Sequence, residues 1–179
     1  MKHTIALVAV FAFFSICEAQ QQEKQTPPQK VSQPQKASNL DLFNGTWKGT
    51  YAIENVRGGG FNVGRTDIEV TRPDKNTVIL KSAYYFTLKC DSSEKKYFFS
   101  SASFTLGNWS GPSIENFPLD FSDKSGYFGQ DTVKTESSEL IREVTIKSNE
   151  KGGYIWAITF NDSKKGKLIC ELTMNEKTK

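Results

Sequence analysis

Alternating apolar and polar side chains run through the chain from residue 39 to residue 179, and this pattern constrains the fold more than any other feature. Successive side chains of a strand point to opposite faces, so such alternation marks strands with one buried face. The expected strands cover residues 45–56, 61–71, 77–89, 96–106, 117–122, 127–135, 139–148, 154–162 and 167–175. No segment shows convincing helical spacing. The sequence therefore predicts an all-β domain of eight or nine strands.

Short turns separate these runs, for example at 57–60 and 149–153, and both contain consecutive glycines. Short connections make successive strands antiparallel neighbours. A sheet of this size has to close into an up-and-down barrel or fold over into two layers. We expect a single antiparallel up-and-down β-barrel, with a two-sheet β-sandwich as the alternative. Gly64 interrupts the alternation, because Phe61 and Val63 are out of phase with Ile68, and a β-bulge is expected there.

The N-terminal residues predict export. Lys2 precedes an apolar run from Ile5 to Cys17, and Ala19 is a small residue suited to a cleavage site, so residues 1–19 resemble a signal peptide. The run is shorter than the roughly 20 residues that span a bilayer, so no membrane span is expected. Residues 20–38 are rich in Gln, Pro and Lys and predict a disordered linker. Residues 39–179 are then the β-barrel domain of a secreted, extracellular protein, or a periplasmic one in a bacterium.

Two further features concern an exported chain. Removal of Cys17 leaves Cys90 and Cys170, and an even number of cysteines in such a chain predicts one disulfide bond. Three Asn-x-Ser/Thr sequons place candidate glycosylation sites at Asn44, Asn108 and Asn161.

The single histidine, His3, lies within the predicted signal peptide. A mature chain without histidine has no Ser-His-Asp or Cys-His machinery and no imidazole ligand for a metal. We therefore predict no catalytic residue, no metal site and no cofactor, and expect the chain not to be an enzyme. An enzyme that works through Tyr, Arg, Glu or Asp is a further hypothesis, although no carboxylate is expected on an inward face. The net charge of +3 is too small to indicate a nucleic-acid partner.

The start of the first expected strand, Phe43-Asn-Gly-Thr-Trp47, resembles the calycin group of lipocalins, fatty-acid-binding proteins and avidins. These barrels begin with a Gly-x-Trp signature, and Gly45-Thr46-Trp47 matches it. The resemblance implies that Trp47 closes the barrel floor and that an arginine from a late strand, Arg142, stacks on it. The chain lacks the lipocalin Thr-Asp-Tyr motif, the helix after the barrel, and the helices that fatty-acid-binding proteins insert after the first strand.

The resemblance also implies a carrier or scavenger of a small, largely apolar ligand. The chain contains 13 Phe, 6 Tyr and 3 Trp, enough to line a cavity or to fill a core without one. The residues expected to contact a ligand are Tyr84, Phe86, Phe104 and Trp156, with Arg142 facing any anionic group. Phe98 is expected to face inward with them.

The alternative function is a secreted protein-binding module with a packed core, such as an inhibitor, effector or adhesin. It would act through the loop at 107–118, the longest connection, which should lie at one rim of the barrel. Trp109 and Phe117 would be its exposed contacts. In a carrier, Trp109 would instead fold into the barrel mouth as a lid.

Overall fold

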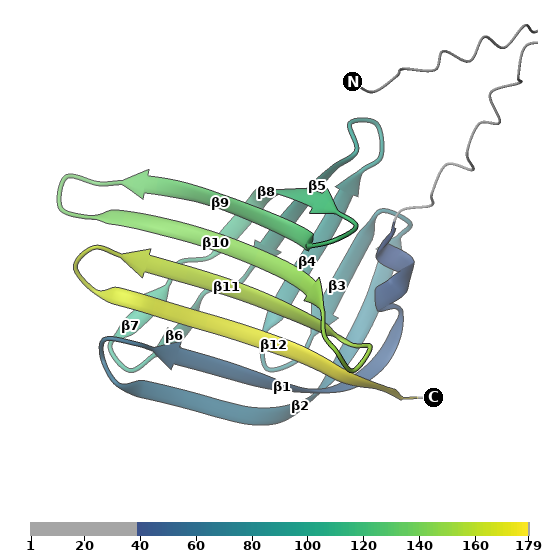
Figure 1. Cartoon of the computed structure of the whole chain (residues 1–179), viewed down its shortest axis with the longest axis horizontal. Coiled ribbons are helices and arrows are strands. Elements are labelled where there is room, and N and C mark those ends of the chain that lie inside the picture. The colour runs from purple at the N-terminus through teal and green to yellow at the C-terminus, as the bar shows by residue number, and fades with distance from the viewer. Residues whose placement is uncertain (1–38, 179) are drawn as a thin grey trace, which may run out of the picture. The chain divides into compact units, whose positions relative to one another are not determined.

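A computed structural model describes residues 39–178, which contain twelve strands and one short 3-10 helix (Figure 1). The elements are η1 (Asn39–Phe43), β1 (Gly45–Asn55), β2 (Gly60–Asp74), β3 (Thr77–Lys81), β4 (Tyr85–Asp91), β5 (Lys96–Ser101), β6 (Phe104–Leu106), β7 (Trp109–Gly111), β8 (Ile114–Ser122), β9 (Gly126–Lys134), β10 (Glu139–Ser148), β11 (Tyr154–Asp162) and β12 (Gly166–Thr178). The predicted signal peptide at 1–19 and linker at 20–38 lie outside the described residues.

Ten of the strands form a closed antiparallel barrel in the order β1-β12-β11-β10-β9-β8-β5-β4-β3-β2, with β2 pairing back to β1. In Figure 1, β9 to β12, β1 and β2 form the near wall, and β3, β4, β5 and β8 form the far wall. Strands β6 and β7 pair only with each other, in a hairpin inserted between β5 and β8. The predicted antiparallel barrel is therefore confirmed, with ten strands rather than eight or nine.

The barrel has ten strands rather than nine because one of the predicted strands is interrupted. The segment predicted as one strand at 77–89 turns back at Ser82, whose N–H donates to the Tyr84 carbonyl at 3.0 Å. The inward series of even-numbered residues continues unchanged from Leu80 to Phe86 across this turn, so the alternation carries no trace of it. The segment predicted at 96–106 is likewise divided into β5 and β6.

One end of the barrel, its floor, is closed by η1 and by Trp47 near the start of β1. Leu40 and Phe43 are fully buried, and the Phe43 ring lies 5.0 Å from the Trp156 ring inside the barrel. Trp47 is 5% exposed and donates its Nε1–H to the Phe43 carbonyl at 3.1 Å. An ion pair between Arg72 of β2 and Asp41 ties η1 to the wall. Trp47 therefore lies beside η1 at this closed end of the barrel.

The opposite end is closed by the β6–β7 hairpin. The Phe104 ring lies 5.5 Å from the Phe160 ring at the end of β11, and a Cβ added at Gly111 would lie only 2.6 Å from the same ring. Gly111 is thus required for the hairpin to approach the core this closely. Both ends of the barrel are consequently filled by side chains of the chain itself.

The bulge predicted at Gly64 is absent. Strands β1 and β2 pair without interruption from Gly45↔Val70 to Asn55↔Gly60. The change of phase has a different cause, because Phe61 and Val63 face outward and are 63% and 57% exposed. Within residues 39–178, no helix combines the length and the apolar character needed to cross a membrane.

Candidate functional site

The predicted ligand-lining residues lie in the barrel but surround no space. Trp156, Phe86 and Phe104 are 0%, 1% and 3% exposed to a water-sized sphere. A void large enough for one water molecule would leave surface on its lining atoms even if it were sealed from solvent. Tyr84 lies at the mouth, half-buried, with its ring 5.6 Å from Tyr51 and 6.3 Å from Phe104. The barrel interior is therefore a packed core at these positions.

Arg142 lies on the inward-facing series of β10, as predicted, but its partner differs from the expected one. Its guanidinium donates to both carboxylate oxygens of Asp131, directly opposite on β9, with Nε 2.8 Å from Oδ1. It also lies 5.5 Å from the Phe117 ring centroid. Hydrogen bonding to Asp131 raises the pKa of Arg142. This fork geometry engages two of the five N–H donors of the guanidinium and gives Arg142 a partner on the inward face.

Trp47 does not stack on Arg142. The cation over its ring is Lys177, with Nζ 5.7 Å from the centroid, and its other neighbour is Tyr154. Arg142 pairs with Phe160, whereas Trp47 contacts Tyr154, six residues away along β11. Trp47 and Arg142 are therefore about 20 Å apart along this strand direction. The arginine–tryptophan contact implied by the calycin resemblance is thus not formed.

The predicted contact residues of the 107–118 segment are turned inward. Trp109 is 5% exposed and Phe117 is 3% exposed. Trp109 therefore takes the lid position rather than that of an exposed contact. The exposed residues of this segment are polar or small, among them Asn108, Pro112 and Asn116.

The predicted disulfide bond is wrong. Cys90 and Cys170 are separate, buried thiols. Cys90 lies at the Trp47 end of the barrel, beside Tyr97 and Tyr127, whereas Cys170 pairs with Ile158 in the middle of β11. Ile158 is four residues along β11 from Tyr154 at the Trp47 end, so the two thiols are about 13 Å apart along the barrel, beyond the reach of a disulfide.

The three sequons all reach the surface. Asn108 and Asn161 are exposed, and Asn44, at the end of η1, is half-buried. Their glycosylation stays a prediction.

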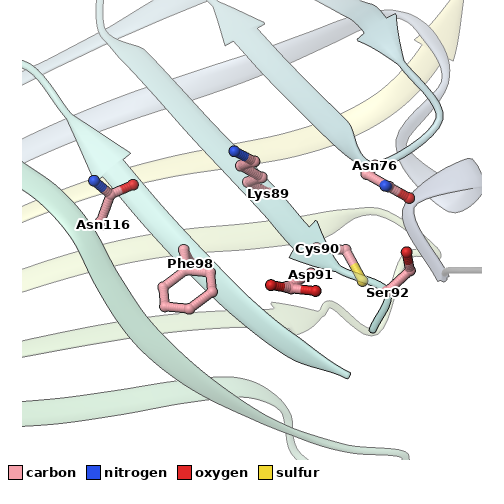
Figure 2. A pocket seen from close by; sticks show the side chains of 7 residues that line it. All are labelled: Asn76, Lys89, Cys90, Asp91, Ser92, Phe98 and Asn116. Carbon is pink, nitrogen blue, oxygen red and sulfur yellow. The ribbon is translucent and has the colours of Figure 1, made fainter. Parts of the chain in front are cut away.

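A concave surface lies on the outside of the barrel, over β4, β5 and β8 (Figure 2). It is an open groove of about 380 Å³. The residues that line it come from three strands and two turns: Asn76, Lys89, Cys90, Asp91, Ser92, Phe98 and Asn116. In Figure 2, Phe98 and Asn116 lie at one end and Asn76 and Ser92 at the other, with Lys89 and Asp91 between them.

Phe98 belongs to this groove and not to the core, which corrects the predicted inward orientation. It pairs with outward-facing Lys89 on β4 and with Pro118 on β8. Its neighbour Phe99, 1% exposed, takes the inward position instead. Three consecutive aromatic residues at 97–99 leave the phase of β5 undetermined in the sequence, which explains the error.

Local backbone geometry shapes both ends of the groove. Asn116 has a left-handed φ of 50°, next to the irregular pairing between β5 and β8, and its N–H donates to Ser100 Oγ at 3.0 Å. At the other end, the Asn76 carbonyl accepts from the Cys90 N–H at 2.7 Å. Asn is among the few non-glycine residues that tolerate a left-handed conformation, which accounts for its use at position 116.

The ionisable groups of the groove include a carboxylate and a thiol. The Ser93 hydroxyl and the N–H groups of Ser93 and Glu94 lower the pKa of Asp91, so this carboxylate is charged at neutral pH. Burial raises the pKa of the Cys90 thiol, which therefore stays protonated and is a poor nucleophile. Across the described residues 39–178, no group of three or more His, Cys, Asp or Glu side chains is placed to hold a metal ion. The sequence offers no motif for the groove, because its residues alternate with core residues on separate strands.

No protein-family model matches the chain, and no curated protein matches it. Among solved structures, the chain is similar to a redesigned beta barrel, with 12% sequence identity and a TM-score of 0.27. That likeness covers 76% of this chain and 94% of the other. Such a TM-score carries no argument about fold or function, so the barrel assignment rests on the strand pairing described above.

Proposed function

We propose that the chain is an exported, non-enzymatic binding module that recognises a partner protein on the outer surface of a packed barrel. The observation that carries this proposal is the filled interior. With Trp156, Phe86 and Phe104 closely packed and both barrel ends occupied, the outside is the surface left for recognition.

The groove over β4, β5 and β8 is the recognition surface we infer. Sites for small molecules enclose most of the surface of their ligand, whereas this groove is open along its length. A protein partner fits it better, because a protruding segment can lie along it. Phe98 supplies an apolar contact, Lys89 and Asp91 supply opposite charges, and Asn76 and Asn116 supply amide groups for hydrogen bonding.

The carrier hypothesis makes an opposite prediction about the interior. A ligand among the predicted lining residues would have to displace the β6–β7 hairpin or η1 from contacts made by fully buried side chains. Titration with a fluorescent fatty-acid probe separates the two functions. We expect no saturable binding, and a stoichiometric complex would favour the carrier.

The binding proposal is tested in the native secretory host with a photo-crosslinking amino acid at position 116. A matched control carries it at Thr132, an exposed position on β9. We expect one partner that crosslinks from position 116, does not crosslink from position 132, and is lost when Phe98→Ala and Lys89→Ala are combined. Equal crosslinking from both positions would contradict the proposal. The intact mass of the same secreted protein tests export, because cleavage before Gln20 has a defined mass.

A further inference from the structure

Half of strand β2 has a hydrogen-bonded strand on one side only, although β6 contacts the start of β2 at Gly60. Its residues 60–70 all pair with β1, but β3 pairs with β2 only from Glu69 onward. In Figure 1 the first half of β2 runs along the lower border of the barrel. Within the described part of the chain, residues 60–68 therefore form a free sheet edge.

The hydrogen-bonding direction along this edge follows from a contact of β1. Val56 continues the outward-facing series of β1 and donates its N–H to the Lys167 carbonyl next to β12, at 2.9 Å. The N–H and C=O of one residue point to the same side of a strand, and the side alternates from residue to residue. Outward-facing residues of β1 thus bond to β12, and inward-facing residues of β1 bond to β2.

The same alternation then applies to β2. Its inward-facing residues bond to β1, so its outward-facing residues direct their backbone groups to the free edge. These are Phe61, Val63, Arg65 and Asp67. Glu69, the next in this series, pairs with Lys81 of β3, which agrees with this assignment.

The edge lacks two of the devices by which proteins block unwanted strand pairing, although it does carry the charged residues Arg65 and Asp67. Residues 60–68 contain no proline, and their pairing with β1 contains no bulge. Phe61 and Val63 are the two most exposed large apolar side chains of the described residues, at 63% and 57%. An unpaired ladder flanked by exposed apolar side chains is a surface for the addition of another strand.

We propose that this edge pairs with the same edge of a second copy of the chain, antiparallel, about a two-fold axis at Gly64. The free stretch 60–68 is centred on Gly64, so this register uses all of it. Residues 61, 63, 65 and 67 of the two copies then exchange about eight backbone hydrogen bonds. The dimer joins the two barrels through a continuous sheet from β1 of one copy to β1 of the other.

The side chains on the outer face fit this register. Val63 lies opposite Arg65 of the second copy and packs on its aliphatic stem. Phe61 lies diagonal to that same guanidinium, within reach of a cation–π contact. An axis at Thr66 would place Arg65 opposite Asp67, but it would also push Phe61 into the place held by β3 of the other copy.

Sedimentation equilibrium of the purified mature protein between about 1 and 500 µM tests the proposal. We expect a monomer–dimer equilibrium that Val63→Pro weakens at least about tenfold, because the substitution removes a donor from each copy and places a ring in the ladder. The monomer should keep its melting temperature, since this N–H has no partner within it. Val63→Ala keeps the N–H and is the matched control, with a smaller loss of affinity.

Hydrogen exchange of the wild-type amides gives a reading that does not depend on folding of the variant. The N–H groups of residues 61, 63, 65 and 67 should exchange fast in dilute solution and become protected as the dimer forms. A monomer at all concentrations, or a dimer unaffected by Val63→Pro, would overturn the proposal. Protection at all concentrations would overturn it too, because a segment of the same chain would then cover the edge. The groove on β4, β5 and β8 is unaffected by any of these results, so the proposed function is judged separately.

Discussion

The closure of the barrel floor by η1 predicts a large and local energetic effect of Phe43→Ala. The Phe43 ring is 1% exposed and lies 4.7 Å from Tyr154, 5.0 Å from Trp156 and 6.4 Å from Tyr127. Its neighbour Leu42 belongs to the same turn of helix but is 54% exposed. The two positions therefore share a backbone environment and differ in burial.

Truncation of a buried Phe to Ala costs about 3–5 kcal/mol, because the transfer free energy is lost and a cavity remains. The three aromatic neighbours are themselves held by other rings, so the site cannot collapse and the upper half of this range is expected. Against a total stability of about 5–15 kcal/mol, this is a large fraction. It corresponds to a decrease in melting temperature of about 10 °C for a domain of this size. Leu42→Ala should change stability by less than about 0.5 kcal/mol.

Urea unfolding followed by tryptophan fluorescence measures both variants, since Trp156 and Trp47 lie beside the site. The difference in midpoint at constant slope gives the change in free energy of unfolding. If Phe43→Ala cost less than about 1 kcal/mol, or no more than Leu42→Ala, then η1 would not close the barrel. The argument that the interior is sealed at this end would fail with it.

Three further outcomes follow from the packing. Trp109→Ala should lower the free energy of unfolding by about 3 kcal/mol in urea titrations, since the Trp109 side chain of the β6–β7 hairpin is buried. A change of less than about 1 kcal/mol would indicate that Trp109 is an exposed contact instead. Burial raises the pKa of Cys170 from 9.0 to about 12, so the contribution of this shift to stability is complete below pH 9 and is lost as the pH rises towards 12. A thiol reagent at pH 8 should label neither Cys90 nor Cys170 until the protein unfolds. Asp131→Ala should cost about 1–2 kcal/mol by leaving Arg142 without its partner, and a double-mutant cycle with Arg142→Ala should recover most of that cost.

The inward faces of most strands could be predicted from the sequence. In β11 and β12, side chains at every second position are buried as expected, from Trp156 to Phe160 and from Leu168 to Met174, and Tyr154 on the same face is half-buried. Alternation of apolar and polar residues marks strands that have one buried face and one solvent-exposed face, so such strands can be located from the sequence. The turn at Ser82 was not predicted, because even-numbered residues face inward both before and after it.

The partners of the inward residues could not be predicted in the same way. Arg142 was expected inward and lies inward, but its partner is Asp131, placed opposite it by the register of β9 and β10. Register depends on turn geometry and bulges, which the alternation of one strand does not contain. The predicted bond between Cys90 and Cys170 failed for the same reason, because parity places both thiols inward but does not determine their height along the barrel.

The groove lies beyond sequence prediction for a different physical reason. It combines outward residues of β4 and β5 with Asn116, whose left-handed backbone depends on an irregularity in the pairing of β5 with β8. Outward residues carry no burial signal. Phe98 carried a misleading one, since an aromatic residue at an outward position resembles a core residue in composition.

The side chains that close the two ends of the barrel contact the same strand, β11. Phe43 contacts Trp156 from the floor, and Phe104 contacts Phe160 from the mouth. Trp156 and Phe160 are four residues apart on the inward face of β11, which is about 13 Å. Between them lies Ile158, and all three side chains are 0% exposed. A ligand with one aromatic ring would have to replace a side chain of this column rather than enter beside it. The aromatic residues that suggested a binding cavity are therefore the ones that fill this column, and the two surfaces proposed for recognition, the groove and the free edge of β2, lie outside it.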